Sequence, residues 1–485
     1  MGVSEAHLIV TTRELSEPVE LLAYADSRDP LVWLRSERGA VGVGEVLRLE
    51  SSGSSRFEDL NRRWRAICGR AEITDRVQLP GSGLIAFGAI TFAANSRAKS
   101  VLTVPRFTLQ RHDDRWFLTR VRTAAEPAHA FERESGFISA AQLSDFGLSP
   151  RDLAGSWQPA EPLAGGSVAP APGGFGTGSG AGAGGDLPGT PADESSKYFQ
   201  SASHLLELLN TREISKIVLA RRQRHTIPAD ADLRIPVSRL ADSYRDCWTF
   251  SVDGLIGASP ETLIRVIAGN ASARVLAGTA SRGADPQTDA AARSLLETSP
   301  LITEEHRFAA QSVISALDPL VENLRTGRDP LVIALPNVWH RATDITAQVS
   351  NSISSLDLVA AMHPTAAVAG TPTAQAVALI AASEGFDRER YAGAVGWIDA
   401  AGDGEWALAL RCAQVSAVPA AVDPATTAVA TSTATPGSAS AAGQGVRRVS
   451  AWAGGGLVAG ADLAGEFTET VIKFRPIRDA FDRPL

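Results

Sequence analysis

The chain has 485 residues, of which 44% are hydrophobic and 21% charged, so it can bury a sizeable core. The formal net charge of -8 gives no general attraction to nucleic acid or to anionic lipid, and we expect neither as a partner. No run of residues is long and apolar enough to predict a membrane span, and the N-terminus does not resemble a secretory signal. The three cysteines form no CxxC pair, which fits a reducing, cytoplasmic location.

Residues 1–158 are expected to form an N-terminal mixed α/β part of the fold. Runs such as LVWLRSE, GLIAFGAITF and SVLTVPRFTLQR are rich in apolar and β-branched residues and predict strands joined by short turns. The segment RFEDLNRRWRAICGRAE has helical spacing instead, with Leu60, Trp64 and Ile67 on one face. This helix should pack against the predicted sheet.

Two segments have the composition of disordered loops. Residues 159–196 are rich in Gly, Ala, Pro and Ser and cannot bury enough apolar surface to offset their ordering entropy. A second low-complexity insertion covers residues 419–445, between the strand-like runs EWALALRCAQV and RRVSAWAGGGLV. The simplest interpretation is a hairpin with an enlarged tip, because lengthening a surface loop has a small entropic effect.

Residues 197–485 are expected to form the catalytic part of the fold. KIVLARRQRHTI, CWTFSVDGLIGAS, TLIRVIAG and ASARVLAG predict successive strands, and SPLITEEHRFAAQSVISALDPLV and LAGEFTETVIKFRPIRDAF predict long helices. Consecutive strands joined by short turns indicate mostly antiparallel sheet with helices packed on it. The sequence therefore predicts an α+β fold in a single domain.

Lys216 is the first candidate for chemistry. Only four of the 46 Lys and Arg residues are lysine, and Lys216 stands at the start of the apolar run KIVLARR. A lysine amine that is partly withdrawn from water can serve as a general base. The alternative is a lysine at a strand end whose amine extends into solvent.

Glu261 is the second candidate, since it follows Pro260 at the end of the buried run LIGAS. An acidic residue after Ser-Pro at that place indicates a tight turn at the edge of a sheet or a cleft, where a carboxyl group can act on a ligand. The alternative is a solvated turn carboxylate or a helix cap.

Carboxylates on two predicted helices form a candidate metal site. Glu304 and Glu305 precede His306 on one long helix, while Glu466 and Glu469 are three residues apart and share a face of the last helix. Such carboxylates can bind a hard divalent cation, preferably Mg²⁺, through oxygen ligands. The alternative is a solvated acidic face, which is common for such pairs.

Two further features can bind an anion. The glycine run AWAGGGLVAG can bring backbone N–H groups close to a ligand, although such runs are often only turns, and it lacks the spacing of a nucleotide site. Arg411 alternates with apolar residues in EWALALRCAQV, where its guanidinium is either paired or available to a carboxylate. His340 and His363 are not at metal-ligand spacing.

Taken together, these segments resemble the chorismate-utilising enzymes over roughly residues 196–480, in the order that the family has them. The matching stretches are KIVLARR, GASPETLIRV, LAGTASRG, EEH, LPNVWHRAT, HPTAAVAGTP, YAGAVGWID with GDGEWALALR, and AGGGLVAGADLAGEFTETVIK. The resemblance implies large antiparallel sheets flanked by helices, an active-site cleft between them, chorismate as the substrate and Mg²⁺ as the cofactor.

The resemblance also implies residue roles. Lys216 matches the lysine that activates water, and Glu261 matches the general acid that protonates the departing hydroxyl. The expected Mg²⁺ ligands are Glu305 and Glu466. Glu469 is expected either to bind Mg²⁺ directly or to contact a group that does. The expected substrate-binding residues are Tyr391, Arg411, Gly454, Gly456 and Lys473 at the carboxylates, and Gly278, Thr279 and His340 around the ring.

Three positions indicate which member of the family the chain resembles. Anthranilate synthases typically lack a lysine at the position of Lys216, and aminodeoxychorismate synthases carry a nucleophilic lysine where this chain has Ala277. Salicylate synthases, which go on to eliminate pyruvate, tend to have threonine at the position of Ala367. The resemblance therefore favours an isochorismate synthase, which adds water at C2 and removes the C4 hydroxyl, with a salicylate synthase as the alternative. Arg341 departs from the family pattern without removing a catalytic position.

The residues say less about the pathway that the enzyme serves and about its oligomeric state. The long N-terminal part is similar to the branch that serves menaquinone biosynthesis, and a catechol siderophore pathway is the alternative. A monomer is the expected state for that branch. A non-catalytic chorismate-binding protein would have lost Lys216, Glu261 or the metal carboxylates, and this chain retains them all.

Overall fold

The structure is a computed structural model that describes residues 6–153, 192–211, 213–283, 285–327, 330–334, 338–417 and 445–482. The predicted loop at 159–196 therefore lies outside the described residues, except for residues 192–196, which form the start of a helix. The predicted insertion at 419–445 lies outside them apart from its last residue.

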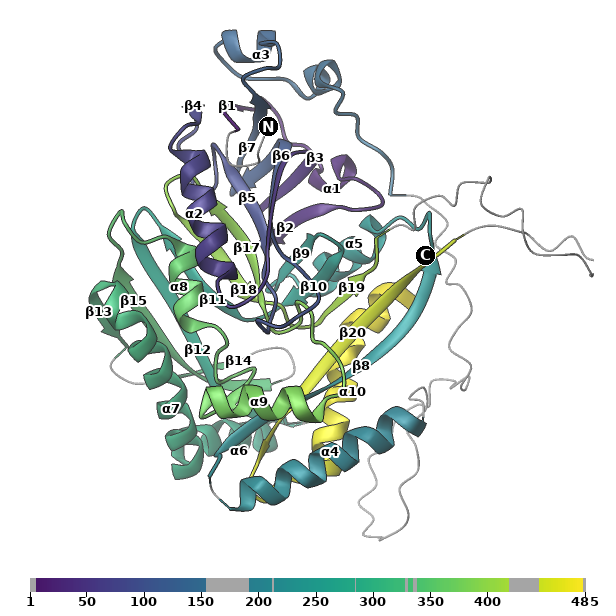
Figure 1. Ribbon diagram of the computed structural model, residues 1–485, viewed down its shortest axis with the longest axis vertical. Coiled ribbons are helices and arrows are strands. Elements are labelled where there is room, and N and C mark those ends of the chain that lie inside the picture. The colour runs from purple at the N-terminus through teal and green to yellow at the C-terminus, as the bar shows by residue number, and fades with distance from the viewer. Residues whose placement is uncertain are drawn as a thin grey trace, which may run out of the picture.

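The N-terminal elements lie at the top of Figure 1. They are β1 (Leu8–Glu14), α1 (Leu21–Tyr24), β2 (Leu31–Arg35), β3 (Arg38–Ser51), α2 (Arg56–Cys68), β4 (Glu72–Asp75), β5 (Ile85–Ala89), β6 (Ser100–His112), β7 (Arg115–Thr123), α3 (Ala130–Arg133) and the 3-10 helix η2 (Ala140–Phe146).

The rest of the described chain alternates helices and strands. The first group is α4 (Ala192–Asn210), β8 (Lys216–Pro228), α5 (Arg234–Ser243), β9 (Trp248–Val252), β10 (Leu255–Ser259), β11 (Thr262–Ile267), β12 (Asn270–Ser281), α6 (Pro286–Thr298), α7 (Pro300–Leu317), η3 (Asp318–Leu320), β13 (Glu322–Thr326), β14 (Leu331–Ala334) and β15 (Val338–Gln348). The second group is α8 (Ser355–Met362), β16 (Gly370–Thr371), α9 (Thr373–Ser383), β17 (Ala394–Asp399), β18 (Gly404–Leu408), β19 (Cys412–Val415), β20 (Val446–Val458) and α10 (Leu463–Asp482).

The strands form one continuous hydrogen-bonded sheet with two arms, the first and the second sheet, which meet at β6. The first sheet runs through β6, β3, β2, β9, β10, β19, β20, β8 and β16, and the second runs through β6, β5, β17, β18, β11, β12 and β15. Among the named strands of the described residues, only β1 and β4 pair in parallel. The predicted α+β fold with mostly antiparallel sheet is confirmed, and Figure 1 shows β20 and β8 well apart from β12 and β15.

The predicted hairpin across the second insertion is also present. Strands β19 and β20 pair antiparallel, with Ala413 opposite Ala451 and Val415 opposite Val449. One predicted strand, EWALALRCAQV, is instead two strands, because the chain bends between Leu408 and Cys412 and continues into the other sheet.

The predicted N-terminal helix packs as its periodicity requires. Leu60, Trp64 and Ile67 of α2 are fully buried, and the Trp64 indole N–H donates to the carbonyl of Asp399 at 2.9 Å. Burying each of these side chains contributes about 1.5–3 kcal/mol. The contact joins the N-terminal elements to the second sheet, so residues 6–153 share one core with the remainder of the described chain.

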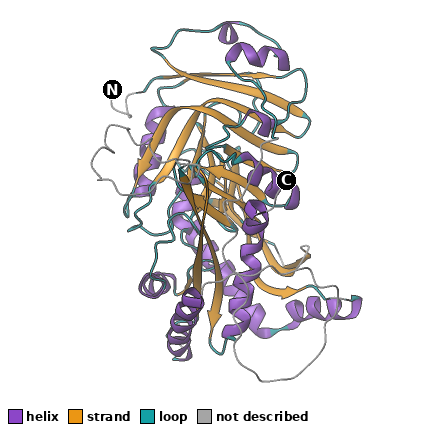
Figure 2. Ribbon diagram, turned by 90° about the vertical axis from the view of Figure 1, so that its right-hand side faces the viewer, coloured by secondary structure: helices purple, strands orange, loops and turns teal. Residues whose placement is uncertain are grey.

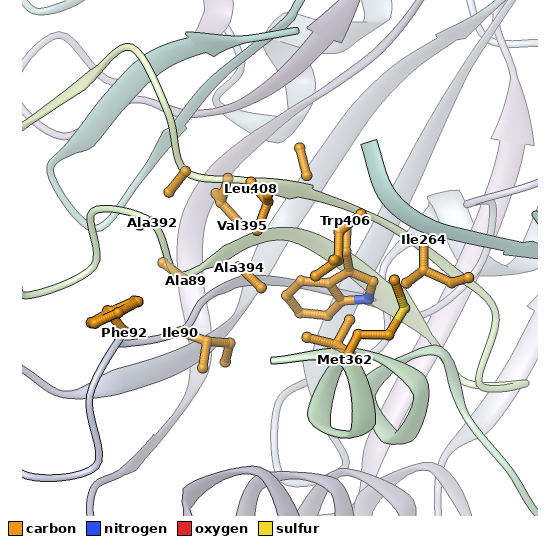
Figure 3. Close-up of a cluster of buried hydrophobic side chains, with 14 of the residues drawn as sticks. Ala89, Ile90, Phe92, Ile264, Met362, Ala392, Ala394, Val395, Trp406 and Leu408 are labelled. Atoms are coloured by element: carbon orange, nitrogen blue, oxygen red, sulfur yellow. The ribbon is translucent and has the colours of Figure 1, made fainter. Parts of the chain in front are cut away.

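The core under the second sheet is built around Trp406, as Figure 3 shows. Its indole packs with Ile264 of β11 and Met362 of α8, and its N–H donates to the Ser355 hydroxyl at 3.1 Å. Gly88 lies against the ring, which a Cβ atom there would approach to 2.4 Å. This packing fixes α8 and the segment after it against the sheet.

Helices line the outer sides of the sheets in Figure 2. Helix α10 packs on β20 and α5, while α7 packs on β12 and α8. Within the described residues, every helix is too short or too polar to cross a membrane.

Candidate active site

Lys216 is held at one end of the first sheet. It is the first residue of β8 and pairs with Val458 of β20 on one side and Thr371 of β16 on the other. Gly370, in the predicted motif HPTAAVAGTP, has φ +137° and lies so close that a Cβ atom would be 2.1 Å from the Lys216 carbonyl. The backbone of Lys216 is therefore fixed on both sides, and its side chain is only partly exposed.

The glycine run belongs to a strand and makes room for functional side chains. Gly454, Gly455 and Gly456 lie in β20 and pair with β8. A Cβ atom at these glycines would lie 3.1 Å from the Tyr391 hydroxyl, 2.7 Å from Glu466 Oε2 and 3.0 Å from Lys216 Cε, in that order. The side chains of Tyr391, Glu466 and Lys216 therefore lie beside the same short stretch of β20.

Replacing Gly455 with alanine should disturb the site without unfolding the protein, because the end of the Glu466 side chain can move out of the way. We expect binding of a divalent cation, for which Glu466 is a predicted ligand, to weaken by about 10–100-fold, the range for changes that misplace a metal-binding carboxylate. Calorimetric Mg²⁺ titration and thermal melting check both parts. Gly69→Ala is the matched control, since Gly69 ends α2 with φ -64° and a Cβ atom there has no contact closer than 3.4 Å. Equal Mg²⁺ affinity in both variants would contradict the prediction.

Glu261 and Arg411 lie on two neighbouring chain segments that cross from one sheet to the other. Glu261 follows β10 and precedes β11, and Arg411 follows β18 and precedes β19. The crossings are hydrogen-bonded to each other, from Leu408 N–H to the Glu261 carbonyl at 3.0 Å and from Ala258 N–H to the Arg411 carbonyl at 3.2 Å. Arg411 has φ +48°, a left-handed conformation that is uncommon for a non-glycine residue and marks the bend.

The Glu261 carboxyl is poised to hold a proton. Burial raises its pKa to about 7, against the opposing effect of the positive charges of Lys216, Arg411 and Lys473. Among the described residues, its carboxyl oxygens have no hydrogen-bond partner. Glu261 therefore faces cations from β8, from the other crossing and from α10 at once.

Glu466 fits a cation site. Burial raises its pKa to about 7, and the negative charge of Glu469 adds to the shift. Its Oε2 atom is buried and has no hydrogen-bond partner in the described part of the chain. Glu469 is more exposed and pairs with Lys473 at 2.6 Å. The side chain of Glu305, the other predicted ligand, lies outside the described residues, and the described side chains alone form no cluster of three metal-binding groups.

The residues predicted around the ring lie on a bulge between β12 and β15. His340 pairs with Thr279, and the register shifts between Leu276 and Thr279. Gly278 has φ +83°, and a Cβ atom there would lie 2.5 Å from Ile302 of α7, so only glycine fits. Burial lowers the pKa of His340, and so does the charge of Arg411, whereas a hydrogen bond with the Gly278 backbone raises it. The side chain of Thr279 lies outside the described residues.

Lys473 and Tyr391, two of the predicted substrate-binding residues, lie next to Gly454 in the glycine run. The Lys473 amine donates to the Gly454 carbonyl at 2.8 Å while it pairs with Glu469. Tyr391 is buried and stacks on Trp452, with ring centroids 6.1 Å apart. Burial raises the pKa of its hydroxyl, which therefore stays protonated and can donate a hydrogen bond.

Two positioning features were not predicted. His306 is fully buried, with one ring nitrogen 2.9 Å from the Ala277 carbonyl and the other 2.7 Å from the Thr343 hydroxyl, so it fixes α7 to the bulge. The buried pair Glu384 and Arg388 is the second, because Arg388 donates to the Val218 carbonyl at 2.7 Å and holds the strand of Lys216. The i, i+4 spacing of Glu384 and Arg388 was the available signal.

A cleft of about 760 Å³ opens beside these residues. Arg411, His340, Pro260 and Ile472 are part of its lining. That volume suits a small-molecule ligand. Lys216 and Glu261 do not line it in the described part of the chain, but Pro260 and Thr262 on either side of Glu261 do. Arg411 has no hydrogen-bond or ion-pair partner among the described side chains, so its guanidinium is available to an anion.

Arg341, the residue at which the chain departs from the family pattern, has a structural role. Its guanidinium donates to the Leu296 carbonyl at 2.7 Å, near the end of α6. A cation at that place satisfies a carbonyl that the helix leaves unpaired.

The fold and the site define a protein with a carboxyl group, an amine and further cations beside a small-molecule cleft. The chain belongs to the family of chorismate binding enzymes, which matches residues 4–144 and 189–422.

Individual relatives agree with this membership. The chain is 37% identical over 279 residues to the MenF protein of Mycobacterium tuberculosis, which covers 55% of this chain and 68% of that one. It is 28% identical over 473 residues to the salicylate biosynthesis isochorismate synthase of Pseudomonas aeruginosa, over 96% and 87% of the two chains. The solved structure of MenF, the menaquinone-specific isochorismate synthase from Escherichia coli, has the same fold, with a TM-score of 0.69 over 98% of this chain and 95% of that one at 18% identity.

Proposed function

We propose that the chain is an isochorismate synthase, an isomerase that converts chorismate to isochorismate. The observation that carries the proposal is a partly buried carboxyl with a pKa near 7, Glu261, which interacts with Lys216, the lysine at the start of β8. An acid and a base of this kind are what an exchange of hydroxyl groups on a ring needs. The similarity to relatives named isochorismate synthases supports the same activity.

The proposed reaction moves one hydroxyl group in two coupled proton transfers. The Lys216 amine takes a proton from water as the water oxygen bonds to ring carbon C2. Glu261, in its protonated form, gives its proton to the C4 hydroxyl, which departs as water. The ring double bonds shift between the two carbons, so one water enters and one leaves. General acid and general base catalysis each contribute roughly 10²–10⁴-fold.

Local cations hold the substrate against the negative charge of the protein as a whole. Chorismate carries two carboxylates, and the net charge of the chain is -8. Arg411 and Lys473 supply positive charge beside Glu261, and Gly454 and Gly456 leave space along β20. The Tyr391 hydroxyl at Gly454 can donate to a carboxylate oxygen, which adds direction to the charge attraction.

The metal carboxylates belong to the proposal as well. Glu466, with a buried oxygen that has no described partner, fits a hard divalent cation, and Glu305 and Glu469 complete the proposed Mg²⁺ ligands. Bound Mg²⁺ would neutralise a substrate carboxylate and orient the ring. The raised pKa of Glu466 fits this arrangement, because a cation would relieve the repulsion between Glu466 and Glu469.

Incubating the purified protein with chorismate and Mg²⁺ tests the activity directly. We expect isochorismate without release of pyruvate, and complete loss of turnover after addition of a chelator that is reversed by Mg²⁺. Product separation by chromatography and a coupled pyruvate assay measure both outcomes. Formation of product only in the presence of ammonia would rule out water activation by Lys216.

A salicylate synthase is the second candidate, and one observation bears on it. Ala367, where salicylate synthases tend to have threonine, is exposed and lines a small cavity that also includes Glu261. The absence of a hydroxyl at that residue favours a reaction that stops at isochorismate. Salicylate and pyruvate in equal amounts in the assay above would assign the chain to the second candidate.

The biological setting completes the proposal. The relatives include a menaquinone-specific enzyme and one of salicylate biosynthesis, and we place this chain in menaquinone biosynthesis, with siderophore biosynthesis as the alternative. A monomeric state and a cytoplasmic location are part of the same proposal. All three cysteines are free, which supports a reducing compartment.

A further inference from the structure

A second, smaller cavity lies next to Glu261. It measures about 40 Å³ and is lined by residues that include Glu261, Thr365, Ser312 and Met362. A single buried water needs about 10–15 Å³ of such space, so the cavity has room for at least one water molecule. A stable buried water also needs polar partners, and in this mainly apolar wall the Glu261 and Thr365 side chains supply them.

Two polar groups of the cavity wall have no partner. The Thr365 hydroxyl oxygen is buried without a hydrogen bond in the described part of the chain, and the Glu261 carboxyl likewise has none. The Thr365 backbone is fixed, because its carbonyl accepts from the N–H groups of Val368 at 3.2 Å and Ala369 at 3.0 Å. A water between the two side chains would satisfy both, whereas an empty cavity would leave the buried Thr365 hydroxyl unpaired.

The cavity borders exposed residues that are not part of the large cleft. Its wall includes Ser312 of α7 and Ala367, both of which are exposed. The large cleft is lined instead by Arg411 and by Ile472 of α10. The two spaces share strand residues such as Thr262 and Leu276, so Glu261 lies near the wall that divides them.

The proposed reaction creates a need for such a route. Each turnover leaves Lys216 with one proton more and Glu261 with one proton fewer, although no proton is consumed overall. Before the next turnover, Lys216 must lose a proton to solvent and Glu261 must gain one. While the large cleft holds substrate or product, Glu261 can be reprotonated only from another side.

The charges around Glu261 fit a carboxyl that is supplied with protons from this cavity. Lys216 faces it from β8, Arg411 from the crossing before β19, and Lys473 from α10. On the cavity side, Arg274 is neutralised by Asp344 at 2.5 Å. No described cation other than Arg274 lines the cavity, so a proton that enters there meets no unpaired positive charge.

We propose that the cavity between α7, α8 and Glu261 holds water that carries protons from solvent at Ser312, through the Thr365 hydroxyl, to Glu261. The proposal rests on the proposed function. In each relay step a donor O–H bond breaks as an acceptor O–H bond forms, so a proton taken from solvent at Ser312 ends on the Glu261 carboxylate. Thr365 is a positioning residue, because it acts on the substrate only through Glu261.

Replacing Thr365 with valine removes the hydroxyl and keeps the branched shape of the side chain. We expect kcat to fall about tenfold, a part of the general-acid contribution, with KM for chorismate unchanged. The solvent deuterium isotope effect on kcat should rise, because proton delivery becomes slower. Small weak acids in the buffer should restore kcat, and Thr365→Ser should keep it near that of the wild type.

A second pair of variants keeps the test decisive if Thr365→Val folds poorly. Ala367→Leu should obstruct the mouth of the cavity and lower kcat while it leaves Thr365 intact. Ala361→Leu is the matched control, since Ala361 is also exposed and close in sequence but does not line the cavity. Wild-type kcat and isotope effect in both Thr365→Val and Ala367→Leu would overturn the relay. A wild-type protein that makes no isochorismate would instead overturn the proposed function.

Discussion

Replacement of Lys216 with alanine is expected to lower kcat by roughly 10²–10⁴-fold, because the reaction loses the base that activates water. Binding of chorismate should be largely preserved, since Arg411, Lys473 and the glycine run remain in place. The fold should also survive, because the Lys216 side chain is partly exposed and only its backbone pairs with β16 and β20. Steady-state kinetics and chorismate binding by calorimetry measure the two effects separately.

The scarcity of lysine in this chain offers a matched control. Lys99 is another of the four lysines, and it is exposed, with its amine donating to the Ser52 hydroxyl at 3.2 Å. Lys99→Ala should therefore retain wild-type kcat. Near-normal kcat in Lys216→Ala would refute its role as the base, while a large rise in KM with unchanged kcat would assign it to substrate binding.

Replacement of Glu261 with glutamine should have an effect of similar size, roughly 10²–10⁴-fold on kcat, because an amide of the same shape cannot donate the proton that the leaving hydroxyl needs. Glu322→Gln is the control, since Glu322 is an exposed carboxylate on β13. A Glu261→Gln variant with wild-type kcat would show that another group supplies the proton.

The pH dependence gives a second measure of Glu261. Its pKa is raised to about 7, and the acid must be protonated to act, so kcat/KM should fall as the pH rises above 7. The same shift predicts stability. A carboxyl whose pKa is higher in the folded protein supports folding at low pH and loses that contribution as the pH rises toward 7. Glu261→Gln should therefore be at least as stable as the wild type at pH 8, and thermal melting across pH checks this.

The sequence was most informative where a residue type was out of place for its local pattern. A lysine opening an apolar strand in a chain that otherwise uses arginine indicated Lys216, and an acid after Ser-Pro indicated Glu261. Helix α2 and most strands followed from periodicity, because the buried faces of Leu60, Trp64 and Ile67 repeat at helical spacing.

The bend at Arg411 could not be predicted from the same information. Strands β18 and β19 are apolar on both sides of the bend, and a continuous apolar run does not reveal where the chain leaves one sheet for another. The bend depends on hydrogen bonds with the crossing of Glu261, a segment that is distant in sequence. Tertiary contacts of this kind have no local signal.

Helix α6 shows the opposite case, in which a local signal was present but not used. Asp285 caps the helix, its side chain accepts from the N–H groups of Gln287 and Thr288, and Pro286 stands in the first turn. The buried contacts of His306 could not be predicted for a different reason, because its partners lie on strands β12 and β15, away from its own helix. The Ala277 partner is a backbone carbonyl, a group that every residue has, so the sequence does not mark the place.

The paired crossings of Glu261 and Arg411 have a consequence for motion in this protein. Because backbone hydrogen bonds join the two segments, the Glu261 carboxyl and the Arg411 guanidinium should move together. Lys216 belongs to a different element, at the far end of the first sheet. Any sliding of the sheets would thus change the gap between base and acid while the donor stayed aligned with the guanidinium, so substrate anchoring and acid catalysis should survive distortions that abolish water activation.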